Sequence, residues 1–373
     1  LLLRVDGFGW QDCLATGPGS AILGSLLFSA LFPAPMSVKF LLRVAGTLLL
    51  AWAAAAACVA LHTPLPWMLG PLVATSVLSM AGAPTESWGP LRNGGQWAIG
   101  AALGLYFTPE VSALVGSLWW AIVLGIGWAL LLGWGFGAWL YRLHAPRMHG
   151  VPASMLRSTS YFAGAIGAAS EMTLLSEREN ARTDLVAASH SLRLLIVTIT
   201  IPFALQWSGL QGLDILTPTV RDVSWPGLAL LALLTGAGAL VMDRLGRANP
   251  WFMGAMLVSM AVTMAGLHLS AVPQAVVNAA QLVIGVSLGV RFRAEFLHTA
   301  PRWLASVAVG TFGLMGICAA FAAVLAWATG LPWVTLLLGT SPGGITEMAI
   351  TAKVLQLGVP VVTGWNAHDA LWT

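Results

Sequence analysis

The stretch that decides the fold class covers residues 44–85 and reads VAGTLLLAWAAAAACVALHTPLPWMLGPLVATSVLSMAGAPT. It contains no Asp, Glu, Lys or Arg, and the segment HTPLP at residues 62–66 divides it into two apolar runs. About 20 apolar residues are enough for a helix to cross the hydrocarbon core of a bilayer. The stretch therefore predicts two membrane-spanning helices, at residues 41–61 and 66–83, with a turn between them.

The composition of the whole chain leads to the same conclusion. Of its 373 residues, 58% are hydrophobic and only 8% are charged, and the mean hydropathy is +0.83. A soluble domain carries about 25% charged residues, so this chain could not cover its own surface in water. The composition excludes a soluble enzyme, a nucleic-acid binder and a secreted disulfide scaffold. Its three Cys residues have no paired spacing either.

The remaining charge-free runs bring the prediction to ten spans. Residues 151–176 and 331–353 are too interrupted by Gly and Pro for a full crossing, so we expect each to enter the membrane and return as a re-entrant broken helix. The runs lack the alternation of barrel strands, and the predicted fold class is an all-α polytopic membrane protein. We expect spans at 41–61, 66–83, 92–108, 112–141, 184–205, 226–242, 250–267, 274–291, 303–328 and from about 358.

The sequence resembles itself at a nearly constant offset. Three blocks recur in the same order, which indicates an internal duplication. Residues 93–104 (NGGQWAIGAALG) match 278–289 (NAAQLVIGVSLG) at an offset of 185, Pro66-Trp67 matches Pro250-Trp251 at an offset of 184, and Glu171-Met172 matches Glu347-Met348 at an offset of 176.

The duplication divides the chain into membrane repeat 1 at residues 36–215 and membrane repeat 2 at residues 216–373, each with about five spans. Residues 1–35 form an atypical N-terminal segment, which we interpret as sequence translated from upstream of the true start or as an extra span. We expect the last span, which begins near residue 358, to be incomplete, and the chain departs from the expected pattern after Thr363.

Loop charges predict that the two repeats have opposite orientations. In repeat 1, Lys and Arg precede span one, lie between spans two and three and follow span four; in repeat 2 they lie between spans one and two and between spans three and four. Cytoplasmic loops carry an excess of Lys and Arg, so equivalent loops should lie on opposite faces. This is an inverted-topology repeat, which is typical of secondary transporters. Arg221 does not fit the pattern, and the alternative is that the loop charges are incidental.

The two broken segments carry the main candidate site residues. A helix that begins inside the membrane has unpaired N–H groups and a positive dipole end. We predict that Glu171 and Glu347, each at such a start, bind a cation, a proton or a cationic group of a substrate. The alternative is that each carboxylate caps its own helix or pairs with a nearby Arg. The residues grouped with these acids are Ser170, Gly343, Gly344 and Thr346.

Four further polar residues are candidates. His190 and Arg193 are three residues apart and share one helix face. Arg193 could neutralise Glu171, bind an anionic substrate or extend to the cytoplasmic surface. Gln96 and Gln281 each begin a stripe with two Gly residues at four-residue spacing. The stripes indicate either close helix packing or a groove that receives the broken helix, with the Gln amides near the substrate.

Enzyme chemistry has little support in the sequence. The seven His residues form no two-His helical pair and no cluster with Cys, so we expect no metal and no cofactor. There is no Gly-Lys-Ser/Thr phosphate motif, so ATP drive within this chain is not expected.

The duplicated Pro-Trp-x-x-Gly and Gln-x-x-x-Gly-x-x-x-Gly blocks, with Pro342-Gly343-Gly344-x-x-Glu347-Met348, resemble the duplicated AbrB-type family of bacterial membrane proteins over residues 40–363. This family is distinct from the soluble DNA-binding regulator of similar name. Its members are labelled AbrB family transporter, ammonia monooxygenase or regulator of gene expression. Ile166-Gly167-Ala168 replaces Pro-Gly-Gly in repeat 1, which weakens the expectation that both broken segments act alike.

These observations lead to a functional expectation. We expect a multi-pass protein of the bacterial inner membrane that transports a small solute by alternating access, with coupling to protons as the simplest drive. The alternatives are a membrane-embedded regulator that binds a ligand without transport and, less favoured, a monooxygenase. The expected partners are the lipid bilayer and the solute, with no nucleic acid, and a homo-oligomer is left open.

Overall fold

The computed structural model describes residues 37–146, 148, 150–167, 169–208, 222–292 and 300–354. The chain divides into two units, Leu1–Arg43 and Val44–Thr373, and every contact described below lies within the second. Throughout the described residues the regular secondary structure is helical, which confirms the all-α polytopic membrane class. The expectations for residues 1–35, the span from about 358 and the end of the chain after Thr363 fall outside the described residues.

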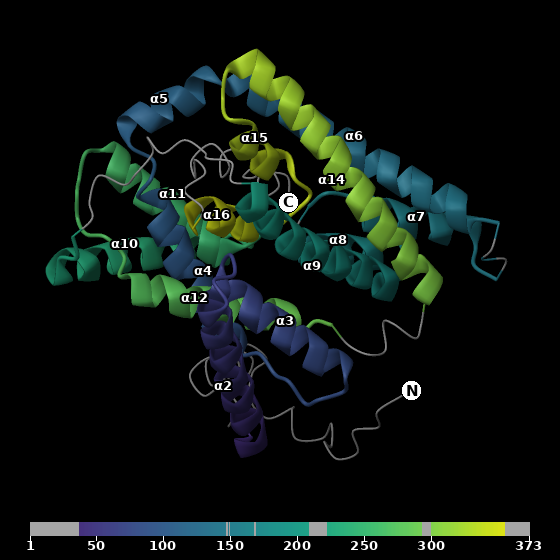
Figure 1. Ribbon diagram of the computed structural model, residues 1–373, viewed down its shortest axis with the longest axis horizontal. Coiled ribbons are helices and arrows are strands. Elements are labelled where there is room, and N and C mark those ends of the chain that lie inside the picture. Colours follow the sequence, from purple (N-terminus) through teal and green to yellow (C-terminus); the bar gives the residue numbers. More distant parts are fainter. Residues whose placement is uncertain are drawn as a thin grey trace, which may run out of the picture. The chain divides into compact units, whose positions relative to one another are not determined.

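The helices follow the predicted order (Figure 1). Those of the first half are α2 (Val38–Ala60), α3 (Pro66–Met80), α4 (Gly89–Gly104), α5 (Pro109–Ser117), α6 (Trp119–His144), α7 (Ala153–Gly164), α8 (Ala169–Arg178) and α9 (Thr183–Ser208). Those of the second half are α10 (Trp225–Arg244), α11 (Pro250–Met264), α12 (Gln274–Gly289), α14 (Pro301–Thr329), α15 (Trp333–Thr340) and α16 (Ile345–Val354).

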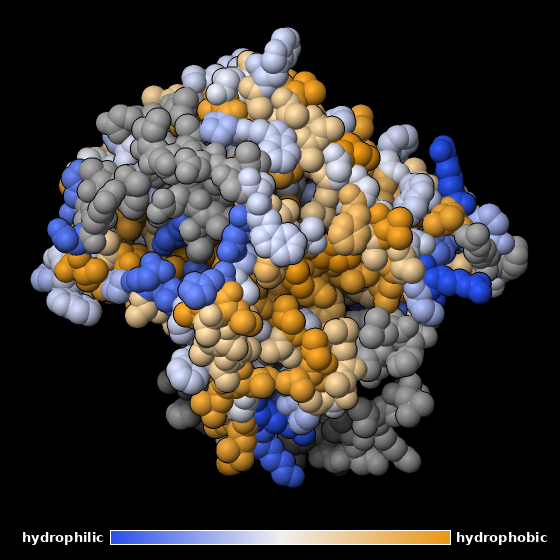
Figure 2. All heavy atoms as spheres, viewed as in Figure 1, coloured by the Kyte–Doolittle hydropathy of each residue, from blue (hydrophilic) through white to orange (hydrophobic). Residues whose placement is uncertain are grey.

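Five of the described helices are long and apolar enough to cross a membrane, namely α2, α6, α9, α10 and α14. Large apolar side chains on them face outward; Trp327 of α14, for example, is 89% exposed. Hydrophobic residues accordingly cover much of the face seen in Figure 2. In water such a surface would be unfavourable, whereas lipid chains can cover it.

The structure departs from the predicted helix at 112–141. The chain breaks at Leu118, whose backbone (φ −98°, ψ 14°) ends α5 and precedes α6. Leu118 is buried, and Thr108 caps the start of α5 by accepting a hydrogen bond from the Val111 backbone N–H at 3.4 Å. No charge marks the break, so the hydropathy pattern could not show it.

Each predicted re-entrant segment is a pair of short helices with a break between them. α7 ends at Gly164 and α8 begins at Ala169, while α15 ends at Thr340 and α16 begins at Ile345. In the second pair, Ser341 is extended (φ −69°, ψ 144°) and Pro342 follows it. A helix cannot continue through the residue before a proline without strain, so the sequence itself sets this break.

The glycine stripes pack closely against helices of the other half. A Cβ at Gly104 of α4 would lie 2.6 Å from the Met256 carbonyl oxygen of α11, and one at Gly289 of α12 would lie 2.8 Å from the Leu72 carbonyl oxygen of α3. Only glycine permits backbones to approach this closely. These glycines therefore have the close-packing role that four-residue spacing predicts.

The equivalent helices α6 and α14 pack side by side and antiparallel (Figure 1). Trp128 stacks on Phe321 with ring centroids 4.4 Å apart, near the end of α14. His144, at the end of α6, lies instead beside Trp303 at the start of α14, at 4.8 Å. Opposite directions for equivalent helices are what an inverted-topology repeat requires; the inverted repeat itself stays a prediction, which this packing supports.

Candidate functional site

A cavity of about 440 Å³ lies where the broken helices meet the core of the second unit. Its wall is built from the start of α4, the α7–α8 break, α9, the turn between α10 and α11, the end of α12 and the α15–α16 break. Elements of both halves thus enclose one space of the size that small-molecule sites have.

Glu171 and Glu347 both line this cavity. They lie in the first turns of α8 and α16. Glu347 is only 7% exposed, whereas Glu171 is half-buried. The two acids that the predicted repeat would relate are therefore brought to a single space, although they are 176 residues apart in the sequence.

The Glu347 carboxylate folds back over the start of its own helix. It accepts a hydrogen bond from its own backbone N–H, and a Cβ at Gly344 would collide with it. A carboxylate is stabilised at a helix N-terminus by the dipole and the free N–H groups. For Glu347 the structure thus shows the capping geometry, in a side chain that also reaches the cavity.

Arg193 holds the C-terminal end of α7. Its guanidinium donates hydrogen bonds to the carbonyl oxygens of Gly164 at 3.2 Å and Ala165 at 2.7 Å, with a longer one of 3.4 Å to Ala163. These carbonyls have lost their helical partners because α7 stops there. Arg193 is 3% exposed, so it does not extend to the membrane surface as one of the alternatives had it.

His190 completes this arrangement. Its Nδ1 lies 2.9 Å from the Arg193 guanidinium and its Nε2 lies 2.9 Å from the Phe162 carbonyl oxygen. A guanidinium can only donate and a carbonyl can only accept. Nδ1 therefore accepts and Nε2–H donates, which fixes the tautomer.

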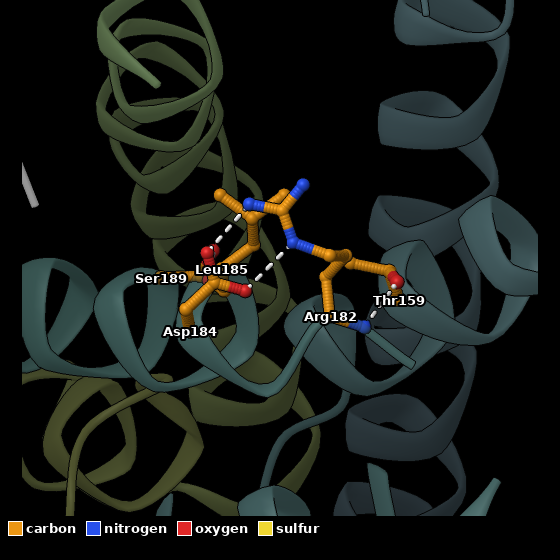
Figure 3. Close-up of polar contacts among 5 residues, drawn as sticks. All are labelled: Thr159, Arg182, Asp184, Leu185 and Ser189. Atoms are coloured by element: carbon orange, nitrogen blue, oxygen red, sulfur yellow. Dashed lines mark hydrogen bonds and ion pairs between the residues drawn. The ribbon is translucent and has the colours of Figure 1, made fainter. Parts of the chain in front are cut away.

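A polar cluster connects α7, the loop between α8 and α9, and the start of α9 (Figure 3). The Arg182 side chain donates to both Asp184 carboxylate oxygens, at 2.9 and 2.6 Å, and its backbone N–H donates to Thr159 Oγ1 of α7 at 2.9 Å. The hydrogen bonds to Asp184 raise the pKa of the Arg182 guanidinium. The cluster joins the α8–α9 loop to α7.

The cavity lining includes most of the candidate residues from the sequence. The two Gln residues differ: Gln96 lines the cavity, whereas Gln281 is 2% exposed within α12 and is not part of the wall. The side chain of Ser170 lies outside the described residues. The candidates on the wall are Gln96, Glu171, His190, Arg193, Gly343, Gly344, Thr346 and Glu347.

Sequence reasoning missed several cavity residues, above all Arg92 and Arg291. Both were interpreted only as loop charges that set orientation, yet Arg92 lies at the start of α4 and Arg291 directly follows α12. Their closeness to the repeated blocks at 93–104 and 278–289 was the signal that could have found them. The end of α10 adds Asp243, and the turn between α10 and α11 adds Arg247 and Asn249.

Asn249 links this turn to the second broken helix. Its backbone is left-handed (φ 51°), a conformation that Asn tolerates better than most residues. Its side-chain amide donates to Thr346 Oγ1 of α16 at 3.3 Å.

Among the described residues, no group of three or more His, Cys, Asp or Glu side chains could hold a metal ion.

Two curated bacterial proteins are similar to this chain. "Putative regulator AbrB" of Escherichia coli (strain K12) is 26% identical over 298 residues, which are 79% of this chain and 82% of that protein. The uncharacterized protein YhjN of Bacillus subtilis (strain 168) is 23% identical over 317 residues, 78% of this chain and 79% of that protein. No solved structure matches.

The family comparison agrees with the resemblance found in the sequence. The model described as transition state regulatory protein AbrB matches residues 67–366, which include the repeated blocks at 93–104 and 278–289, both broken segments and every described residue of the cavity wall. This chain therefore belongs to the AbrB family of membrane proteins.

Proposed function

We propose that this protein is a secondary transporter that carries a small solute across the bacterial inner membrane by alternating access. The observation that carries the proposal is the meeting of Glu171 and Glu347, at the starts of two broken helices, in one cavity. Broken helices whose ends point into a shared central space are typical of substrate and ion sites in secondary transporters.

The short helices of the core support this proposal. α3, α4, α11 and α12 have 15 or 16 residues each. At a rise of 1.5 Å per residue they extend about 22–24 Å, less than the roughly 30 Å of a bilayer core. Short segments at corresponding positions of two halves are a pointer to a transport site.

The charge distribution suggests which side the cavity faces. Asp243 and Arg247 are exposed and also line the cavity, and exposed Arg244 is their neighbour. Cationic loops favour the cytoplasmic side. We infer that the cavity is open to the cytoplasm and that a second state, open to the other side, completes the cycle.

The site assignment is tested by flux in proteoliposomes. The probes are radiolabelled succinate, γ-aminobutyrate and putrescine, which share a four-carbon body and differ in charge, each with and without an imposed pH gradient. We expect protein-dependent uptake of one probe, reduced at least tenfold in the double variant Glu171→Gln/Glu347→Gln, since an intramembrane acid carries the proton or cation. Unchanged flux in that variant would remove the two acids from the site.

The second candidate function is a membrane-embedded regulator that binds a ligand without net transport. The printed names of the family and of the E. coli relative favour it, and the same cavity could hold the ligand. Saturable binding of a probe to the purified protein, with no flux of that probe in vesicles, would favour the regulator.

A further inference from the structure

We propose that the cavity binds a small organic oxyanion through Arg92 and Arg291. This rests on the proposed function for the passage of the ligand across the membrane, and it names the chemical class of that ligand. Arg92 comes from the start of α4 and Arg291 from the end of α12, and both line the cavity.

The two guanidinium groups repel each other. They are close enough for the charge of Arg92 to act on Arg291, and both are half-buried. Repulsion between two cations is stronger in a partly buried site than in water, because the effective dielectric constant is lower. An oxyanion between the two groups would replace this repulsion by two attractive, charge-assisted contacts.

The described acids leave these arginines available. Neither Arg92 nor Arg291 is within 4.0 Å of a described carboxylate, and the ion pair between Arg182 and Asp184 lies outside the cavity wall. The Arg92 Nε is buried and has no hydrogen-bond partner among the described residues. The hydrogen bond that Arg92 does make, to Asn93 Oδ1, is long at 3.5 Å.

Two acids of the wall, Glu347 and Asp243, do not favour a cation beside the two arginines. Glu347 already accepts a hydrogen bond from its own backbone, and its charge also acts on Arg291. Asp243 lies at the exposed mouth of the cavity. The buried Glu347 carboxylate therefore has a local partner, whereas the Arg92 Nε needs an acceptor that the described chain does not supply.

The wall next to the arginines also has an apolar part. Leu194 of α9 and Ile284 and Leu288 of α12 line the same cavity. Apolar side chains bind carbon, and a cavity of about 440 Å³ holds more than an inorganic ion. The preferred ligand is thus a carboxylate or a phosphate group on a small carbon body.

Binding to the full-length protein in nanodiscs tests this proposal by calorimetry. The anionic probes are succinate and glycerol phosphate. The matched four-carbon controls are succinamide, which is neutral, and putrescine, which is cationic. We expect saturable binding of at least one anion and none of the two controls.

Four variants locate the site. Arg92→Gln and Arg291→Gln should each weaken binding of the anion about tenfold or more, since each removes a charge-assisted hydrogen bond to the ligand. Arg244→Gln is the matched control, because Arg244 is exposed and is not part of the wall. Arg92→Lys should retain more binding than Arg92→Gln, which separates loss of charge from loss of fold.

Three results would overturn the anion site: no binding of either anion up to about 10 mM, tighter binding of putrescine than of succinate, or unchanged binding in both Gln variants. Binding is measured without a gradient, so it is independent of transport. Anion binding without flux would contradict the transporter and leave the site intact, whereas flux of putrescine alone would contradict the site and leave the transporter intact.

Discussion

At the scale of single residues, Arg193 has a role that differs from the usual one of a membrane arginine. Its guanidinium lies at the break between α7 and α8 and donates hydrogen bonds to the carbonyl oxygens that have no helical partner at the end of α7. An unsatisfied carbonyl inside a membrane protein is costly, and one arginine satisfies several at once. The side chain thus makes the broken helix possible.

Replacing Arg193 should accordingly reduce stability. We expect Arg193→Ala to lower the free energy of unfolding by about 2–4 kcal/mol, because several buried carbonyls lose their donor together. Arg193→Lys should restore only part of this, since an ammonium lacks the planar fork. Thermal unfolding in detergent measures the effect, with exposed Arg178→Ala as the control. Equal stability of the two Ala variants would contradict the capping role.

At the scale of elements, the core depends on helix pairs formed between the two halves. α4 packs on α11, and α12 packs on α3, through glycines that allow the backbones to touch. Gly100 contacts Phe252, and Gly104, four residues later, contacts Met256. Because both positions move in the same direction along the chain, α4 and α11 run parallel. Each short helix is therefore stabilised by a partner about 150–220 residues away rather than by its own length.

Two glycines of α4 provide a matched comparison. A Cβ at Gly104 would meet the Ser259 side chain and the Met256 carbonyl, whereas one at Gly94 would meet nothing within 4 Å. We expect Gly104→Ala to destabilise the protein by about 1–3 kcal/mol through overpacking. Gly94→Ala should be neutral or stabilise by up to about 1 kcal/mol, because alanine favours the helix. Unfolding midpoints of the two variants in detergent decide this, and the reverse order would refute the packing argument.

At the scale of the whole molecule, α6 and α14, which the predicted repeat relates, run in opposite directions. The C-terminal end of α6 lies beside the N-terminal start of α14. The C-terminal ends of the two helices therefore lie at opposite ends of the pair. If both helices cross the bilayer, their C-terminal ends face opposite compartments. Both broken helices then reach the cavity from opposite sides, which suits a transporter with two access states.

Reporter fusions test this orientation in cells. A reporter that is active only in the cytoplasm should be active when fused in the loop at 142–150 and inactive when fused at 329–333. The loop at 62–66 serves as a control, because it should share the compartment of 329–333. The same compartment for 142–150 and 329–333 would exclude the inverted repeat.

The sequence by itself determined the membrane class, nearly all described helices and both breaks, because hydropathy, Gly and Pro act locally on the backbone. It also predicted that Glu171 and Glu347 occupy equivalent positions of an internal repeat. Only the tertiary structure decided the break at Leu118, the burial of Gln281, the capping by Arg193 and the meeting of Arg92 with Arg291. These depend on packing between segments far apart in the chain, and no local pattern records which distant side chains come to share a cavity.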